Sequence, residues 1–415
     1  MRKIKKFFSS FGPGLITGAS DDDPSGIATY SIAGAQSGYT TLWTVLFTFP
    51  LMSAVQEMSA RIGLVTDRGL VGNMKLHYPK IFLYAIASMV VVANTINIGA
   101  DLGGMAAASK LLLDINPLIY GIFYTGFIVL TMLFVPYHIF SRYLKWLTLA
   151  LFTYVLAAII TKQDWLEIIR DTILPQISFK PEYIILIVAI FGTTISPYLF
   201  FWQASEEVEE VDEEKRIRKL KRHIVTKHEL KNMRGDVTTG MFFSNLVMFF
   251  IIATTASTLF ANGIHDIQTA DQAAVALKPL AGDASGLLFT LGIVGTGLLA
   301  IPVLAGSAAY ALSEAFGWSE GLNKKFREAK AFYLIIIAST ILGFFMNLLN
   351  INPFDALFYT AVIYGFISPV IILLILHMGN QKSIMGVNTN GIISNTLGTI
   401  TFVIMTAAVV GLIFV

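Results

Sequence analysis

Long apolar stretches separated by short polar segments fill almost the whole chain. Eleven of these stretches approach or exceed about 20 residues, the length that a helix needs to cross a bilayer. They lie near residues 11–37, 42–65, 81–113, 117–135, 143–161, 183–208, 237–261, 286–316, 331–349, 353–377 and 391–415. The pattern therefore predicts an all-α integral membrane protein with 11 transmembrane helices.

Composition agrees with this pattern. Of the 415 residues, 55% are hydrophobic and 13% are charged, whereas a soluble domain carries roughly 25% charged residues. The chain contains no cysteine, which excludes disulfides, thiolate catalysis, cysteine-bound zinc and iron–sulfur clusters. A net charge of +2 gives no reason to expect a nucleic-acid partner. We expect the lipid bilayer as the surroundings and no obligate protein partner.

Lysine and arginine are distributed unevenly between the two ends of the predicted helices. With the N-terminus inside, 24 of the 29 basic residues fall on the inner side and 5 on the outer side. Cytoplasmic loops carry such an excess, so we predict a multi-pass protein of the cytoplasmic membrane. Its N-terminus would be cytoplasmic and its C-terminus extracytoplasmic.

The segment 206–236 is the one long polar stretch. An acidic block at 206–214 is followed by nine basic residues between Lys215 and Arg234. Opposite blocks predict a charged cytoplasmic loop that contains a helix pairing with itself. The basic half would lie near anionic lipid headgroups, and the acidic half could attract cations to the cytoplasmic mouth.

The first apolar stretch is interrupted by three carboxylates, Asp21, Asp22 and Asp23, followed by Pro24, Ser25 and Gly26. Charge inside a membrane is costly, and proline and glycine disfavour a continuous helix. Such a combination is tolerated where unwound backbone lines a cavity. We therefore predict half of a buried cation site here.

The sixth stretch contains a second candidate break, from Gly192 to Tyr198 with Pro197 inside it. Interrupted first and sixth helices indicate two five-helix repeats of opposite topology with the site between them. The first repeat would span about 11–161 and the second about 183–377, with an accessory helix at about 391–415, all in one domain over 1–415. A simple proline kink at Pro197 is the alternative.

Four motifs resemble those of the Nramp family of divalent-metal transporters. The stretch 12–26 resembles its first helix, whose motif reads Asp-Pro-Gly-Asn, and 192–198 resembles its sixth, which usually ends in Met-Pro-His. The stretch 56–70 resembles the end of its second helix, and 101–104 lies where its third helix carries an acidic pair. The resemblance implies a LeuT-like fold with discontinuous helices 1 and 6, and transport of divalent metal.

Position by position, the resemblance retains the family's ligating aspartate as Asp23. The family's asparagine is Gly26 here, its methionine is Ser196, and its small carbonyl-bearing residue is Thr193. The expected ligands are thus all oxygen, with Ser25 and Gly26 contributing backbone. A site without a thioether suits a hard, partly hydrated ion such as magnesium. The pattern is closest to the Nramp-related magnesium transporter branch, and manganese also accepts oxygen and water.

The other polar residues leave alternatives open. Asp22 would help to hold a hydrated ion, and Asp21 would lie on the pathway. Each of these two carboxylates could instead bond to backbone amides freed by the break. Asp101 is either a second group at the site or a carboxylate bonded to Asn94 and Asn97. Tyr364 lies roughly where the family has an amide.

The resemblance does not extend to the groups that would relay protons, since the family's third-helix glutamate is Gly104 and its sixth-helix histidine is Tyr198. We therefore predict import of Mg²⁺ and Mn²⁺ without proton coupling. The alternatives are a proton-coupled Mn²⁺ or Fe²⁺ importer and a cation-coupled symporter of a small organic solute. An intramembrane aspartyl protease using Asp23 and Asp101 would leave the breaks unexplained. We expect that the protein is not an enzyme and needs no cofactor, and that the metal is the substrate it transports.

Overall fold

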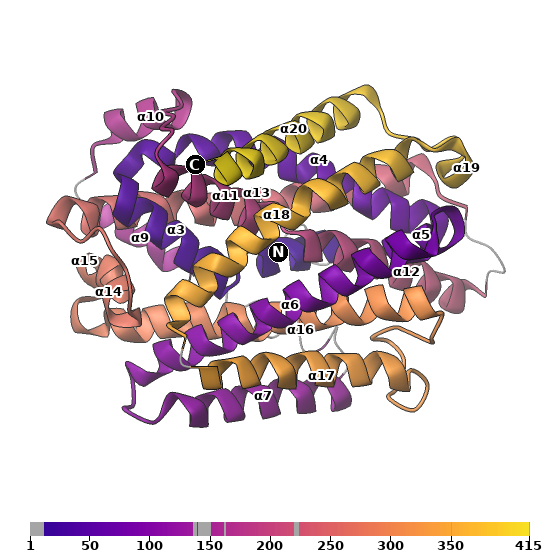
Figure 1. The fold of residues 1–415 in the computed structure, drawn as a ribbon, viewed down its shortest axis with the longest axis horizontal. Helices are drawn as coiled ribbons and strands as arrows, with labels where there is room; N and C mark the ends of the chain where they lie inside the picture. Colours follow the sequence, from indigo (N-terminus) through magenta and orange to yellow (C-terminus); the bar gives the residue numbers. More distant parts are fainter. Residues whose placement is uncertain are drawn as a thin grey trace, which may run out of the picture.

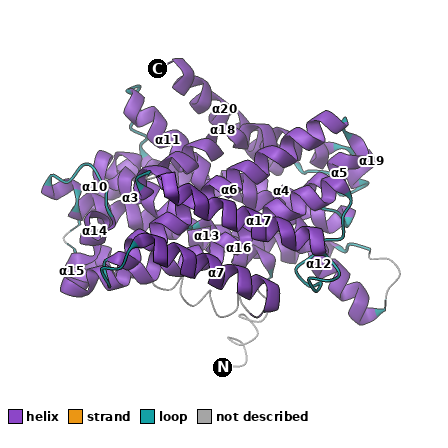
Figure 2. Ribbon diagram, turned by 60° about the horizontal axis from the view of Figure 1, so that its bottom comes forward, coloured by secondary structure: helices purple, strands orange, loops and turns teal. Residues whose placement is uncertain are grey.

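The computed structural model describes residues 12–135, 139, 151–161, 163–219, 224–349 and 351–414. This part of the chain is helical and contains no strand (Figure 2). Its first helices are α2 (Pro13–Asp21), α3 (Pro24–Ser37), α4 (Trp43–Thr66), α5 (Leu70–His77), α6 (Lys80–Lys110), α7 (Pro117–Phe134), α9 (Phe152–Ile160) and α10 (Trp165–Ile173). They are followed by α11 (Pro181–Thr194), α12 (Pro197–Arg218), α13 (Lys227–Thr258), α14 (Ala270–Ala274), α15 (Lys278–Ala281), α16 (Ser285–Phe316), α17 (Lys330–Met346), α18 (Pro353–Asn380), α19 (Lys382–Met385) and α20 (Ile392–Phe414).

Eight of the described helical stretches are long and apolar enough to cross a membrane, judged by length and composition. They correspond to the third, fourth and sixth to eleventh apolar stretches of the sequence. The first stretch is divided between α2 and α3, the second forms α4, and only the end of the fifth is described, as α9. The all-α prediction is confirmed. The count of 11 stays a prediction, because residues 143–150 of the fifth stretch lie outside the described residues.

Both expected breaks are present, and they have the same construction. α2 ends at Asp21 and α3 begins at Pro24, while α11 ends at Thr194 and α12 begins at Pro197. Each second half-helix starts with proline, which lacks an N–H and disfavours helical backbone in the residue before it. We call Asp22–Asp23 the first break and Ile195–Ser196 the second break. The proline-kink alternative for Pro197 is wrong.

Helices from the two halves of the chain pack against each other in matching pairs. α4 packs along α12, and α13 packs along α3, so each second half-helix has an uninterrupted helix from the other half of the chain beside it. α6 lies against α16 and α17, and α7 covers the outer side of that group (Figure 1). This exchange of partners supports the proposed division into two repeats.

The first half-helix, α2, lies unusually close to α13. A Cβ atom added at Gly18 would collide with the backbone of Gly240, and one added at Gly240 would collide with that of Gly14. Close backbone contact of this kind needs small residues on both helices. Asp236 of α13 also accepts hydrogen bonds from the backbone N–H groups of Gly12 at 3.1 Å and Gly14 at 2.7 Å. The N-terminal end of α2 is thus held on α13 by packing and by a carboxylate.

The described residues of the segment 206–236 are mostly helical, in line with the expected helix, while its place as a cytoplasmic loop stays a prediction. α12 continues through the acidic block to Arg218, and α13 begins at Lys227 with a capping box between Thr226 and Glu229. The expected pairing within a helix does occur, since Lys215 lies 3.1 Å from Asp212 and Arg216 pairs with Glu213. Pairs three residues apart on one face stabilise continuous helix, so the charges extend α12 instead of ending it.

Candidate functional site

Asp23 is the most heavily bonded side chain at the first break. It is the N-cap residue of α3 and is 1% exposed. Its Oδ1 accepts from the hydroxyl of Ser25 at 2.8 Å and from the N–H of Gly26 at 2.7 Å. Its Oδ2 accepts from the amide Nδ2 of Asn97 at 2.8 Å. These donors fix the carboxylate in one orientation at the point where the helix is unwound.

The two breaks face each other through Gly26 and Thr193. A Cβ atom built on Gly26 would lie 3.2 Å from the hydroxyl of Thr193 and 3.5 Å from Oδ1 of Asp23. Position 26 therefore borders the space between α3 and α11. Ser196 of the second break is buried, and its hydroxyl donates to the backbone oxygens of Gly192 at 3.2 Å and of Thr193. The Ser196 oxygen keeps its lone pairs for another partner.

Asp21 and Asp22 are buried and share a partner on α13. The hydroxyl oxygen of Ser244 lies 2.5 Å from Oδ2 of Asp21 and 3.5 Å from Oδ1 of Asp22. The other oxygen of Asp21 has no hydrogen-bond partner in the described structure. The proposed alternative, bonding of these side chains to freed backbone amides, does not appear among the described hydrogen bonds.

Asp101 of α6 is fully buried, and neither of its carboxylate oxygens has a hydrogen-bond partner in the described structure. The backbone amide of Ser25 faces it without forming a hydrogen bond of normal geometry. The alternative in which Asp101 bonds to Asn94 and Asn97 is wrong. Asn94 bonds to Leu304 and Tyr364 instead, and Asn97 bonds to Asp23. Asp101 therefore lies beside the first break with free oxygens.

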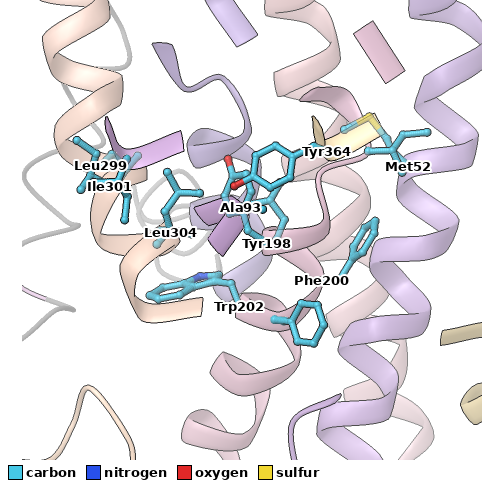
Figure 3. Close-up of a cluster of buried hydrophobic side chains, with 14 of the residues drawn as sticks. Met52, Ala93, Tyr198, Phe200, Trp202, Leu299, Ile301, Leu304 and Tyr364 are labelled. Atoms are coloured by element: carbon cyan, nitrogen blue, oxygen red, sulfur yellow. The ribbon is translucent and has the colours of Figure 1, made fainter. Parts of the chain in front are cut away.

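Tyr198 and Tyr364 lie side by side among buried apolar residues, as Figure 3 shows, with ring centroids 5.6 Å apart. The Tyr198 hydroxyl donates to the backbone oxygen of Ser20 at 2.8 Å, in the last turn of α2. The Tyr364 hydroxyl donates to Oδ1 of Asn94 at 2.9 Å. Tyr198 thus contacts the half-helix that ends at Asp21, whereas Tyr364 bonds to none of the expected ligands.

The sequence interpretation named Asn97 only as a possible partner of Asp101 and did not name Ser244; both come from helices other than the two broken ones. Asn97 and Asp101 are four residues apart on an apolar helix and so share one face. That spacing was the available signal for Asn97. Among the described residues no group of three or more His, Asp or Glu side chains could hold a metal ion. A metal at the breaks would therefore depend on one or two carboxylates together with hydroxyl, amide, backbone and water oxygens.

The acidic block of α12 borders a separate cavity of about 410 Å³, lined among others by Glu209, Glu314, Glu320 and Lys324. Glu209 accepts from the backbone N–H of Asn323 at 3.0 Å, which ties α12 to the loop before α17. Burial, and then the charge of Glu314, raise the pKa of Glu320 to about 9, so this carboxyl is protonated at neutral pH. The cavity is therefore less negative than its composition suggests.

Two pairs of half-helices around a buried carboxylate define the class of protein by its fold, which is LeuT-like. The fold is shared with the manganese transporter of Eremococcus coleocola, at a TM-score of 0.77 and 15% identity over 96% of this chain and 84% of that one. Mhp1, a nucleobase-cation-symport-1 family transporter, has a TM-score of 0.53 at 12% identity over 97% of this chain and 92% of that one. The predicted fold class is confirmed.

The chain belongs to the Nramp family, since the profile described as "Natural resistance-associated macrophage protein-like" matches residues 14–415. Similar proteins include the divalent metal cation transporter MntH of Yersinia pestis (strain Pestoides F), 27% identical over 309 residues, which are 72% of this chain and 70% of that protein. MntH of Klebsiella pneumoniae is 25% identical over 310 residues, covering 72% and 69%. The protein is thus a multi-pass membrane transporter and not an enzyme, as predicted, and its family implies no cofactor.

Proposed function

We propose that this transporter carries divalent metal cations, with Mg²⁺ as its main substrate and Mn²⁺ as a second one. Asp23 would be the principal ligand, aided by Thr193 and Ser196, by Asp22, and by the backbone of Ser25 and Gly26. Asp21, Asp101, Tyr198 and Tyr364 would line the pathway. The MntH relatives are named as divalent metal cation transporters, which supports the ion class.

The observation that carries the magnesium proposal is the oxygen-only character of the two breaks. Position 196 holds serine where the family motif has methionine, and position 26 holds glycine where it has asparagine. Loss of the soft thioether removes the preference for transition metals. The smaller residues also leave more room, and Mg²⁺ binds with several of its waters retained. These substitutions favour a hard, partly hydrated ion.

Competition between ions tests this proposal. In proteoliposomes that contain the purified transporter, Mg²⁺ is expected to inhibit Mn²⁺ uptake with a half-maximal concentration within about tenfold of the Mn²⁺ KM, because both ions accept an oxygen-only site. Ca²⁺, Fe²⁺ and Cd²⁺ complete the panel, and empty liposomes give the background. Inhibition by Cd²⁺ and Fe²⁺ without inhibition by Mg²⁺ would show that the site prefers soft metals.

We further propose that uptake is driven by the membrane potential and not by protons. A potential of about 100 mV supplies roughly 4.6 kcal/mol to a divalent ion. A pH-sensitive dye inside the proteoliposomes is expected to report no change while Mg²⁺ or Mn²⁺ enters. Acidification that depends on both the metal and the protein would instead support the proton-coupled alternative.

The charge distribution supports the remaining part of the proposal, the orientation. The side with 24 basic residues would face the cytoplasm, and the C-terminus after α20 would lie outside.

A further inference from the structure

One face of α6 points two polar side chains at the first break. Asn97 and Asp101 are one helical turn apart, and both are fully buried. Asn97 contacts Asp23 directly, and Asp101 faces the backbone of Ser25. Neither is part of the two broken helices that supply the expected ligands.

The contact with Asp23 determines how the Asn97 amide is oriented. Nδ2 donates to Oδ2 of Asp23 at 2.8 Å, so the carbonyl oxygen Oδ1 is the amide atom that this contact does not use. That oxygen is buried and has no hydrogen-bond partner in the described structure. A buried polar atom without a partner costs about 1–3 kcal/mol, so its retention here needs a reason.

Asp101 adds two more unpartnered oxygens one turn further along. No ion pair of the described residues involves it, and no described side chain donates to it. A fully buried carboxylate that has no counter-charge, and only the backbone amide of Ser25 facing it, is among the least favourable groups in a folded protein. Three oxygens from α6 are thus left without partners next to the carboxylate of Asp23.

The lack of a side chain at Gly26 suggests a role for these three oxygens. A side chain at position 26 would project toward Thr193 and Asp23, which is where the family motif places its asparagine. With glycine there, α3 offers no amide. We infer that Asn97 of α6 supplies the missing amide ligand through Oδ1, and that Asp101 holds water molecules that a divalent cation retains. This inference rests on the proposed function, because it names further ligands of the same site.

The oxygens of Asn97, Asp101 and Asp23 are of the kind that binds a hard cation. An amide oxygen and carboxylates are the ligands that Mg²⁺ and Ca²⁺ take, and Mg²⁺ keeps several waters that need acceptors around them. The Asn97 N–H fixes Asp23 while its oxygen faces the ion, so one side chain would orient one ligand and provide another. A ligand on α6, which is unbroken, would also restrict the size of the ion.

Two substitutions separate a ligand from a residue that only positions Asp23. Asn97→Leu removes both the N–H and the oxygen. Asn97→Asp keeps an oxygen toward the ion and loses the N–H donor to Asp23. Calorimetric titration of the purified full-length transporter with MgCl₂ and with MnCl₂ is expected to show binding weakened by about 10–100-fold in Asn97→Leu. Asn97→Asp is expected to bind within about threefold of the original chain, or more tightly, because it adds a negative charge.

Asn347→Ala serves as the matched control. The Asn347 amide also bonds to α6, donating to the backbone oxygen of Gly99 at 3.0 Å, and none of its described hydrogen bonds is to Asp23. Its binding should equal that of the original chain, and near-ultraviolet circular dichroism should show all variants folded. Equal losses in Asn97→Leu and Asn97→Asp would mean that Asn97 only positions Asp23, and no loss in Asn97→Leu would also overturn the inference. The titration with Mn²⁺ remains informative if the original chain does not bind Mg²⁺, an outcome that would contradict the proposed function alone.

Discussion

Replacement of Asp23 by asparagine is expected to reduce Mg²⁺ and Mn²⁺ uptake at least about 100-fold, a loss that corresponds to about 2.7 kcal/mol. Asparagine has nearly the same volume and is as good an N-cap as aspartate, so α3 keeps its start. Only the charge is lost, and the carboxylate is the group that would attract a divalent ion most strongly. Uptake by proteoliposomes in a tracer assay measures the effect.

The chain offers a control with the same chemistry at another helix. Asp164 is the N-cap of α10, accepts from the N–H groups of Leu166 and Glu167 at 3.1 Å each, and is exposed. Asp164→Asn should therefore leave uptake unchanged. If Asp23→Asn transported as well as Asp164→Asn, the carboxylate at the first break would be a structural cap and the proposed site would be wrong.

The helices and their breaks could be predicted because a lipid bilayer allows few backbone structures. A segment in lipid must satisfy its backbone internally, so long apolar stretches become helices. Proline alone did not identify the breaks, since Pro50, Pro302 and Pro369 lie inside continuous helices. What distinguished Pro24 and Pro197 was the polar residues beside them and their matching places in the two halves of the chain.

The partners of the polar side chains could not be predicted from the sequence. Asn94, Asn97 and Asp101 follow one another at helical spacing, which suggested bonds among themselves. Asn94 instead bonds to α16 and α18, whereas Asn97 and Asp101 face the start of α3, because the packing of α6 against these three helices decides where each side chain points. Sequence spacing shows that residues share a face of a helix, and tertiary contacts decide what that face meets.

Glu57 and Arg61 of α4 are four residues apart and form an ion pair, and the structure shows further partners for both. Both side chains are 5% exposed. Arg61 also donates to the backbone oxygen of Thr389 at 3.3 Å and to Ser394 at 3.2 Å, and Arg234 of α13 lies 3.2 Å from Glu57. This cluster joins α4, α13 and the start of α20.

Arg61→Leu is expected to lower the apparent free energy of unfolding by about 3–5 kcal/mol, since it leaves the Glu57 charge buried with the exposed Arg234 as its remaining basic partner. Titration of the purified protein from mild detergent into dodecyl sulfate measures it. The more exposed pair of Arg216 and Glu213 is the control, and Arg216→Leu should cost no more than about 1 kcal/mol.

The double variant Arg61→Leu/Glu57→Leu separates two explanations for the effect of Arg61→Leu. One is the loss of an attraction, and the other is a buried Glu57 charge left unpaired. Removal of both partners leaves no unpaired charge, so the double variant should be more stable than Arg61→Leu alone. If it were less stable, the charges themselves would hold α4 to its neighbours. The expected recovery of stability would mean that Arg61→Leu is destabilising because it leaves the Glu57 charge buried without Arg61, and not because the attraction between the two charges is lost.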